Sequence, residues 1–349
     1  MTDHDGHSRT HTRRPRYPGR NPRQFHEKYK EHAPALHPDT VAQVRASGKT
    51  PAGMHLPIMV GEVLQCLTPG PGETVVDCTL GGGGHAQALL ERIVPNGRLI
   101  GLDVDPLELP RTEARLRALG YGPDVFIPRH GNFAGLPQAL AELGITTVDA
   151  VLADLGVSSM QIDNPDRGFT WKGVGPLDMR MNPARGEPAS ALLARLREDE
   201  LAALLVEYAD EPYAELIARL LIREKVETSH AAERVIRMGL NAAKPGLSRP
   251  EVKLSVRRTF QALRIAVNGE LSVLEALLRS LPDVLAPGGR VAILTFHSGE
   301  DRRVKKAFQT GRRAGVYAAI SDGVIQSTVE ETRANRRASS AKLRWAVRA

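Results

Sequence analysis

The stretch "VVDCTLGGGGH" (Val75–His85) decides the fold, because a short apolar run is followed at once by four glycines and a histidine. A simple turn between a strand and a helix needs only one or two glycines. A strand that ends at Asp77, a glycine loop and the helical segment "HAQALLERI" form the arrangement in which backbone N–H groups and a helix N-terminus face a ligand. We therefore expect a ligand to approach the backbone of Gly81–Gly84 closely.

Beyond this loop, short apolar runs alternate with helical stretches, which is typical of a parallel sheet with crossover helices. Each run is rich in Val, Ile or Leu, as strands covered on both faces should be. About 135 residues separate the fourth run from the fifth, too many for a loop, so a folded insertion is expected there. The candidate strands are Thr74–Asp77, Arg98–Asp103, Asp124–Pro128, Val148–Asp154 and Arg290–Phe296.

Apolar residues at helical spacing indicate that much of the second half is helical. The segment "DEPYAELIARLLIREK" has Pro212 at a plausible first helical position. The segment "GELSVLEALLRSLPDVL" carries a stripe that should face a core, made of Leu274, Leu277, Leu278 and Leu281.

The chain is therefore expected to have three parts. Residues 1–54 form a basic, largely disordered N-terminal extension, because they are rich in Arg, Pro, His and Gly with little periodic apolar content. Residues 55–163 and 251–349 form the domain that contains the sheet. Residues 164–250 form an inserted helical domain that recognises the substrate.

Cysteine content and hydropathy favour a soluble protein of the cytoplasm. Cys66 and Cys78 are the two cysteines, too few for a disulfide framework. No apolar run approaches the roughly 20 residues that a membrane-spanning helix needs. The polar N-terminus also lacks the apolar core of a signal peptide. We expect no metal site, and a homodimer is compatible with the sequence, which does not fix the oligomeric state.

The formal net charge of +7 is unevenly distributed. Residues 1–30 carry eight basic against three acidic side chains, a net of +5, and residues 302–349 carry twelve against three, a net of +9. Residues 31–301 therefore have a net charge of −7. Two basic ends on an acidic body favour a polyanionic partner such as RNA, although a basic tail can also serve only to keep a protein in solution.

Two ligand classes are compatible with the glycine loop. Gly81–Ala86 satisfies the pattern G-x-G-x-x-G/A, and Asp103 follows at a distance suited to a ribose-binding carboxylate, so a dinucleotide site is formally allowed. Asp77, however, places a negative charge where a dinucleotide would bring its pyrophosphate. S-adenosylmethionine would bring a cationic sulfonium and an ammonium group to the same place, so charge favours S-adenosylmethionine.

The fourth candidate strand ends in "VLADLGVSSMQID", which places Asp154 at the carboxyl edge of the sheet. Ligands of open α/β sheets bind at that edge. An acidic residue that closes an apolar strand loses hydration unless it has a partner, so a role in the site is favoured over a role in packing.

The residues now match a known family. The runs "HLPIMVGEV", "DCTLGGGGH", "LDVDP", "HGNF", "LADLGVSSMQID", "GPLDMRMNPARG", "RRTFQALRIAVNGEL" and "FHSGEDR" follow one another as in the MraW/RsmH family, which the chain resembles over residues 55–349. That family methylates the exocyclic N4 of a cytidine in the decoding region of bacterial 16S ribosomal RNA. The resemblance implies the α/β fold of a class I methyltransferase, Rossmann-like with a mostly parallel sheet and a helical insertion. It also implies S-adenosyl-L-methionine as cofactor and the small ribosomal subunit as partner, and it assigns cofactor contacts to Gly83, Gly84, His85, Asp103, Phe133, Asp154 and Gln161.

Some segments depart from the family pattern. Gly82 stands where the family usually has arginine, and "YADEP", "LSVR" and "NRRASSAKLR" differ from the usual runs. Residues 1–54 have no counterpart in the short relatives. These departures affect the insertion and the surface that faces RNA more than the cofactor pocket.

The chemistry suggests a role for Asp154. A cytosine amine is a poor nucleophile, because its lone pair is shared with the ring. Asp154 and carbonyl groups of residues 155–159 are expected to accept its two N–H bonds and direct the lone pair at the methyl group. Phe169 and Trp171 are candidates to receive the flipped base, although both can equally anchor the insertion. His297 is expected at the same edge. Candidate phosphate contacts are Arg258, Arg264, Arg302, Arg303, Lys305 and Lys306.

Three other functions remain open from the residues alone. Methylation at carbon 5 of cytosine needs a cysteine thiolate, and neither cysteine follows the fourth or fifth strand. A non-catalytic RNA-binding factor in ribosome assembly would explain the basic ends but leaves the acidic residues unexplained. An oxidoreductase of the NAD type would bind a dinucleotide at the glycine loop.

Overall fold

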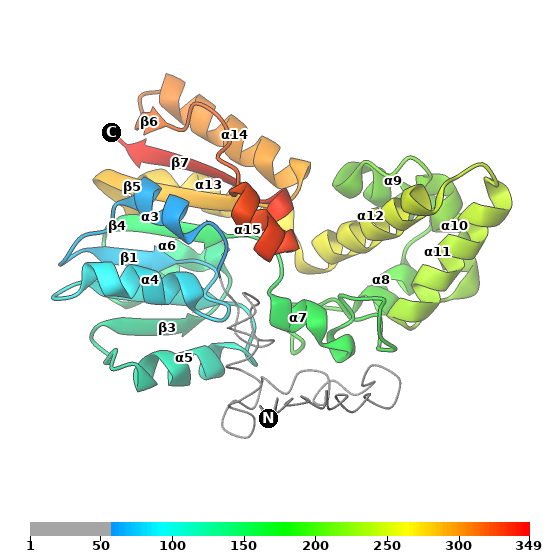
Figure 1. Cartoon of the computed structure of the whole chain (residues 1–349), viewed down its shortest axis with the longest axis horizontal. Coiled ribbons are helices and arrows are strands. Elements are labelled where there is room, and N and C mark those ends of the chain that lie inside the picture. The colour runs from blue at the N-terminus through cyan, green and yellow to red at the C-terminus, as the bar shows by residue number, and fades with distance from the viewer. Residues whose placement is uncertain (1–56) are drawn as a thin grey trace, which may run out of the picture.

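The computed structural model describes residues 57–349. A sheet flanked by helices forms one end of the molecule, and a group of helices forms the other (Figure 1). The expectations for residues 1–54 lie outside the described residues. No helix between residues 57 and 349 is long and apolar enough to cross a membrane.

The sheet has seven strands in the order β3-β2-β1-β4-β5-β7-β6. β1, β2, β3, β4 and β5 pair in parallel, whereas β7 pairs antiparallel with both β5 and β6. This mostly parallel sheet confirms the class I methyltransferase fold. Its strands are β1 (Thr74–Asp77), β2 (Arg98–Asp103), β3 (Phe126–His130), β4 (Val148–Asp154), β5 (Leu285–Thr295), β6 (Tyr317–Ile320) and β7 (Lys342–Arg348).

The predicted strands agree with the structure at β1, β2 and β4. The third strand lies two residues later than predicted. The fifth begins earlier, at Leu285, because the chain through Pro287 and Gly288 pairs irregularly with β4 before the regular ladder starts. β6 and β7 were not predicted at all.

Helices cover both faces of the sheet, because successive strand residues point to opposite sides. Val76 of β1 belongs to one buried cluster, together with the predicted leucine stripe of α13, which is confirmed as buried. Val75 belongs to the cluster on the other face. Helices α6 (Leu136–Glu142), α13 (Glu270–Val284) and α14 (Ser298–Arg313) cover the first face, and α3 (Val60–Leu67), α4 (Gly84–Ile93) and α5 (Leu109–Ala118) cover the second.

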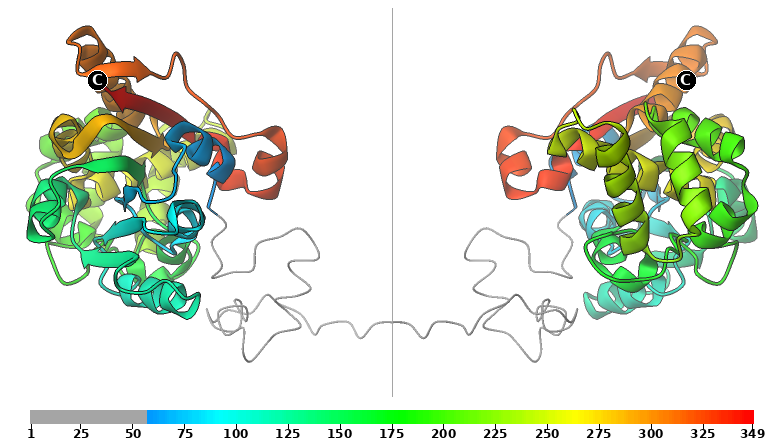
Figure 2. Two further views of the ribbon diagram at one scale, coloured as in Figure 1. Left: turned by 90° about the vertical axis from the view of Figure 1, so that its left-hand side faces the viewer. Right: turned by 90° about the vertical axis from the view of Figure 1, so that its right-hand side faces the viewer.

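The remaining long helices surround a third buried cluster and stand apart from the sheet in Figure 1. In Figure 2 the sheet faces the viewer on the left, and these helices face the viewer on the right. The 20-residue helix α12 (Arg249–Asn268) belongs to this cluster through Val252, Val256 and Phe260. The expected boundary at residue 250 therefore falls inside one continuous helix, which begins at the capping box of Ser248 and Glu251. The other helices of this group are α8 (Ala189–Arg195), α9 (Glu198–Ala209), α10 (Ala214–Glu224) and α11 (Ser229–Ala243).

Two short elements lead from β4 to the helical part, α7 (Ser159–Asp163; Figure 1) and the 3-10 turn η3 (Pro165–Arg167). The other short elements lie within the part that contains the sheet. The 3-10 turn η2 (Phe133–Gly135) follows β3, and α15 (Val329–Ala334) and the 3-10 turn η4 (Arg336–Ser340) lie between β6 and β7.

Candidate active site

A cavity of about 680 Å³ lies at the carboxyl edge of β1, β2 and β4, with α12 on its far side. This volume suits a small-molecule site. Its lining includes every residue for which a cofactor contact is expected, namely Gly83, Gly84, His85, Asp103, Phe133, Asp154 and Gln161. The sheet thus brings these side chains to one cavity, as the position of its strand ends predicts.

The glycine loop lines the cavity, but the reason for two of its glycines differs from the prediction. Gly83 has a φ of 72°, and a Cβ there would lie 2.7 Å from Thr112 Cγ2. A Cβ at Gly84 would lie 2.6 Å from Pro57 Cδ. Neighbouring protein atoms, rather than a ligand, therefore exclude side chains at Gly83 and Gly84. The loop is held between these atoms and the cavity, and it presents main chain to the cavity.

Asp103 lies at the end of β2, half-buried, with both carboxylate oxygens bonded to backbone groups. Its Oδ2 accepts from Gly81 N at 2.7 Å, and its Oδ1 accepts from Asp105 N at 2.8 Å. Burial raises the pKa of Asp103 to about 6, and these two hydrogen bonds oppose that shift. Asp103 therefore fixes the glycine loop while it faces the cavity, and each oxygen keeps a further lone pair for a ligand.

Asp77 and Asp154 lie close together with unsatisfied oxygens. Asp77 Oδ2 and Asp154 Oδ1 are buried and have no hydrogen-bond partner within residues 57–349. Burial raises the pKa of Asp77 to about 7, and repulsion from Asp103 adds to the shift. Burial raises the pKa of Asp154 to about 8, with further repulsion from Asp77 and Glu300. Such a cluster attracts a cation.

The positions of these two carboxylates differ in one respect from the prediction. Asp154 lines the cavity, and its side chain is 21% exposed. Asp77 is 1% exposed and lies behind the loop, where its Oδ1 accepts from Thr79 N at 3.0 Å. Asp77 therefore acts on the cavity through its charge and not through contact.

His85 lies between the first described residues and Asp154. Its Nε2 is 3.0 Å from Ile58 O, and its Nδ1 is 3.6 Å from Asp154 Oδ2. Because a carbonyl oxygen can only accept, Nε2 carries a proton and donates to Ile58 O. The Nδ1 side of the His85 ring therefore faces Asp154.

Gln161 and Phe133 also line the cavity. Gln161 is buried in a capping box with Ser158, and its Nε2 donates to Asp105 Oδ2 at 2.9 Å. Most of its hydrogen-bonding capacity is therefore used within the protein. Phe133 is half-buried and packs against the sheet while it lines the cavity.

The far side of the cavity is aromatic and apolar. Trp171 and Phe260 of α12 meet edge to face, with ring centroids 4.9 Å apart. Phe169, Met179 and Met181 line the same side. Phe169 and Trp171 belong to the helical cluster and also line the cavity, so the two roles considered for them are compatible.

Four ionisable residues form a largely buried group near the C-terminal end of α12. Arg264 donates to both oxygens of Glu270, at 2.7 and 2.8 Å. His297 Nε2 lies 3.2 Å from Glu300 Oε1. Burial raises the pKa of Glu270 against the opposing Arg264 charge, whereas in Glu300 the His297 hydrogen bond and charge outweigh burial and lower the pKa. All four line the cavity.

The structure corrects part of the expected phosphate-binding set. Arg264 is paired with Glu270, and Arg303 donates to Glu275 at 2.8 Å. In the basic C-terminal region, Arg344 is 8% exposed and paired with Asp301. Much of the positive charge there is therefore used within the fold. Arg258, Arg302, Arg303, Lys305 and Lys306 do not line the cavity.

Four other cations do line it. Lys172, Arg257 and Arg336 come from three separate segments, are exposed, and have no ion pair within residues 57–349. The fourth, Arg337, is paired with Asp163 at 3.1 Å. These cations were not predicted, because nothing in the local sequence pattern distinguishes a cation at a cavity from one on a solvated helix face. Glu270 and Asn268 were not predicted either, because their importance depends on contacts between distant segments.

Comparisons with known proteins identify the family to which this chain is similar. The model of the MraW methylase family matches residues 52–349. The chain is similar to Ribosomal RNA small subunit methyltransferase H 1 of Lachnoclostridium phytofermentans, with 46% identity over 344 residues that cover 97% of this chain and 93% of the relative. It is also similar to Ribosomal RNA small subunit methyltransferase H 2 of Alkaliphilus metalliredigens, with 48% identity over 350 residues that cover 99% and 100%. Both alignments include most of residues 1–54. Among solved structures, an rRNA methylase from Streptococcus thermophilus is 12% identical, covers 83% of this chain and 93% of its own, and has a TM-score of 0.38.

Proposed function

This chain belongs to the MraW methylase family, and we propose that it uses S-adenosyl-L-methionine to methylate the exocyclic N4 of a cytidine in the decoding region of 16S ribosomal RNA. The methylation of small-subunit ribosomal RNA follows from the family and its relatives. The choice of the N4 atom and of the decoding region is the further part of the proposal.

The observation that supports this proposal best is the pair of unsatisfied buried oxygens on Asp77 and Asp154. A cavity edged by carboxylates with raised pKa values stabilises a ligand that carries positive charge. S-adenosyl-L-methionine supplies an electrophilic methyl group on a cationic sulfur, so the residues present fit this cofactor. A dinucleotide would bring its negative pyrophosphate to the same carboxylates, and the NAD-type oxidoreductase is therefore disfavoured.

Each expected cofactor residue has a role that its surroundings support. Asp103 has lone pairs to accept ribose hydroxyls, and Phe133 offers an aromatic face to the adenine. The main chain of Gly83 and Gly84 can approach the cofactor closely. Gln161 fixes the turn at Ser158 and has one amide N–H left for the polar tail.

Asp154 is the proposed catalytic residue. In its ionised form it can accept an N–H bond from the cytosine amine and so keep the nitrogen lone pair directed at the methyl group. Residues 155–158 line the cavity beside it, and a carbonyl group of this turn is the proposed second acceptor. His85 lines the cavity beside it, with Nδ1 3.6 Å from Asp154 Oδ2.

The far side of the cavity suits the nucleic acid. Trp171 and Phe260 provide flat apolar surfaces for a base that has left its stack. Lys172, Arg257 and Arg336 surround them with unpaired positive charge, which favours a phosphate backbone. A purely RNA-binding assembly factor would use the same cations, but it would not need the carboxylates.

Methylation at carbon 5 is disfavoured by the state of the cysteines. Cys78 lines the cavity, but burial and the neighbouring Asp77 raise its pKa well above the ordinary value. Burial likewise raises the pKa of Cys66, in α3, to about 11. Neither thiol is therefore prepared to attack a base as a thiolate.

The direct test uses small ribosomal subunits from a strain that lacks the modification. The protein is incubated with these subunits and labelled S-adenosyl-L-methionine, and the labelled base is mapped by mass spectrometry. We expect one methyl group on N4 of a cytidine in the decoding region. A label on carbon 5, or on another nucleotide, would contradict the proposal.

Asp154→Asn tests the role of the carboxylate. We expect turnover to fall by about 10²-fold or more, because the orienting charge is lost. The control is Asp149→Asn at the opposite end of the same strand, where Asp149 accepts only from Thr74 N; its turnover should stay close to wild type. Full turnover of Asp154→Asn with normal cofactor affinity would refute the assignment.

A further inference from the structure

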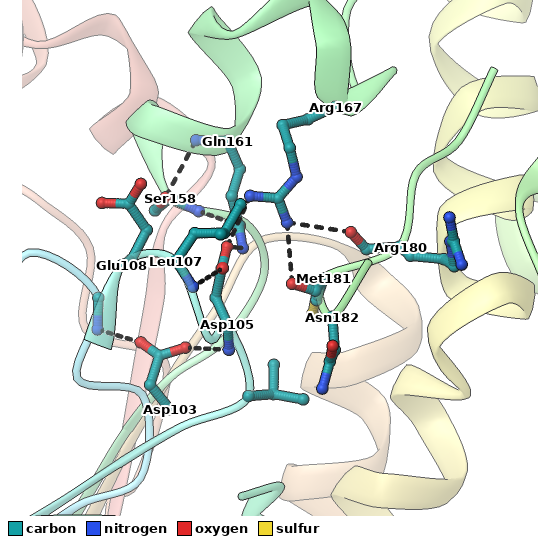
Figure 3. Close-up of polar contacts among 12 residues, drawn as sticks. Asp103, Asp105, Leu107, Glu108, Ser158, Gln161, Arg167, Arg180, Met181 and Asn182 are labelled. Atoms are coloured by element: carbon teal, nitrogen blue, oxygen red, sulfur yellow. Dashed lines mark hydrogen bonds and ion pairs between the residues drawn. The ribbon is translucent and has the colours of Figure 1, made fainter. Parts of the chain in front are cut away.

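A continuous chain of hydrogen bonds joins the two sides of the cavity (Figure 3). It starts at Asp103, on the side of the sheet, and passes through Asp105 and Arg167 to the backbone of Met181. From there it reaches Asn268 at the end of α12. Asp103, Met181 and Asn268 all line the cavity. This series of hydrogen bonds therefore connects Asp103, proposed for the cofactor, with the side of the cavity proposed for the RNA base.

The half on the sheet side is centred on Asp105, which is 1% exposed. Its backbone N–H donates to Asp103 Oδ1, and its own Oδ1 accepts from Leu107 N at 2.9 Å. Its Oδ2 accepts from Arg167 Nη1 at 2.8 Å and from Gln161 Nε2 at 2.9 Å. Arg167 is thus the cation that balances a buried carboxylate next to the expected ribose contact.

The half on the helical side is centred on the other nitrogen of Arg167. Nη2 donates to Met181 O at 2.8 Å and to Arg180 O at 3.1 Å. The backbone N–H of Met181 donates to Asn268 Oδ1 at 2.7 Å, and Asn268 Nδ2 donates to Met179 O at 2.8 Å. The segment that carries Met179 and Met181 is therefore held between Arg167 and α12.

The guanidinium of Arg167 has a geometry that lysine cannot reproduce. Its planar fork sends one nitrogen to Asp105 and the other to two carbonyl groups. Arg167 is buried, so these bonds form away from solvent and hold their partners at fixed separations. Fixed separation between donor and acceptor is what a methyl transfer needs, since a misplacement of about 1 Å can reduce a rate by about 10²-fold.

We propose that Arg167 is a positioning residue that sets the distance between the cofactor side and the base side of the cavity. It acts through Asp105 and Asp103 on one side, and through Met181 and Asn268 on the other. This inference rests on the proposed function, because it assigns the two sides of the cavity to cofactor and base.

The test compares Arg167→Lys with Arg290→Lys as a matched control. Arg290 also combines a carboxylate partner, Glu73, with bonds to backbone carbonyls, at Leu67 and Thr68. It lies far from the cavity in the sheet and is not among the lining residues. Four quantities are measured for each full-length variant: thermal midpoint, affinity for S-adenosylhomocysteine, affinity for the RNA substrate, and kcat.

For Arg167→Lys we expect kcat to fall by about 10²-fold while both affinities stay within about 5-fold of wild type. Arg290→Lys should lower the thermal midpoint about as much as Arg167→Lys does, but it should leave kcat near wild type. A merely structural role of Arg167 would instead weaken both affinities along with stability. The inference is overturned if Arg167→Lys keeps kcat within about 3-fold of wild type, or if its loss in kcat/KM equals its loss in cofactor affinity.

A second variant covers the case in which Arg167→Lys does not fold. Asn268→Ser removes the contact at the other end of the chain, and we expect the same fall in kcat with little change in affinity for S-adenosylhomocysteine. Unchanged kcat in Asn268→Ser then overturns the inference. If the wild-type protein itself transfers no methyl group, the proposed function fails and not this inference alone.

Discussion

Asp77→Asn is expected to make the protein more stable at pH 8 in the absence of ligand. Asp77 is almost fully buried, and its Oδ2 has no partner within residues 57–349. Its charge is therefore unfavourable for folding and useful only when a cation lies nearby. Asparagine has nearly the same shape and carries no charge.

The magnitude follows from the pKa of Asp77, which burial raises from 3.8 to about 7. A carboxyl group whose folded pKa is raised contributes its full stability only below the unfolded value, and that stability is lost as the pH rises towards the folded value. At pH 8 the loss for the wild type is about 4 kcal/mol, at 1.36 kcal/mol per pKa step. At pH 5, where only the unfolded state is ionised, the loss is about 1.6 kcal/mol.

The stabilising effect of Asp77→Asn should therefore shrink by about 2–3 kcal/mol between pH 8 and pH 5. The buried amide of asparagine can itself cost about 1–3 kcal/mol, but that cost does not depend on pH. Removing the charge also lowers the repulsion that raises the pKa of Asp154, which acts in the same direction. Urea unfolding of wild type and variant at both pH values measures the change. Parallel pH profiles for the two proteins would refute the reasoning.

Three further predictions concern the same cavity. Affinity for S-adenosyl-L-methionine should fall as the pH drops below about 8, because the carboxylate of Asp154 becomes protonated and no longer attracts the sulfonium. The affinity for S-adenosylhomocysteine, whose sulfur is neutral, should depend less on pH in calorimetry. Equal slopes of affinity against pH for the two ligands would contradict this prediction. Gly83→Ala should lower stability by about 2–3 kcal/mol in thermal unfolding, because of its positive φ and the contact with Thr112. Gly81 also has a positive φ, but a Cβ there would make only an ordinary contact with Thr79 O at 3.8 Å, so Gly81→Ala should lose only about 1 kcal/mol; equal losses would count against the close approach. The third change replaces with glutamine the three unpaired cations of the cavity, Lys172, Arg257 and Arg336. The slope of log K against log salt for RNA binding should then become less steep by about 2, and an unchanged slope would exclude these residues as phosphate contacts.

The sheet was predictable where a strand is buried on both faces. Val75–Val76 and Val151–Leu152 are apolar on both sides, so their composition alone indicates a strand. β7, with the sequence "KLRWAVR", alternates charged and apolar residues inside a basic region. The positive charge of residues 302–349 predicted a surface that contacts RNA, whereas Arg344 is buried and paired with Asp301. A charge whose partner lies 43 residues away leaves no local signal.

The candidate site was predictable where strand ends determine it. Asp103 and Asp154 terminate β2 and β4, and parallel strands place their carboxyl ends at the same edge. The glycine loop was located correctly, but the atoms that exclude side chains at Gly83 and Gly84 belong to α5 and Pro57. Arg167 was missed, because its partner Asp105 lies 62 residues away.

The position of β7 has a consequence for folding. β7 lies between β5 and β6, and within residues 57–349 it alone pairs with the outer edge of β5. Until residues 342–348 dock, the largely buried strand β5 has an open edge, which is a template for misassociation. Folding intermediates that lack β7 should therefore be prone to aggregate, and a chaperone that shields β5 should raise the yield of refolding.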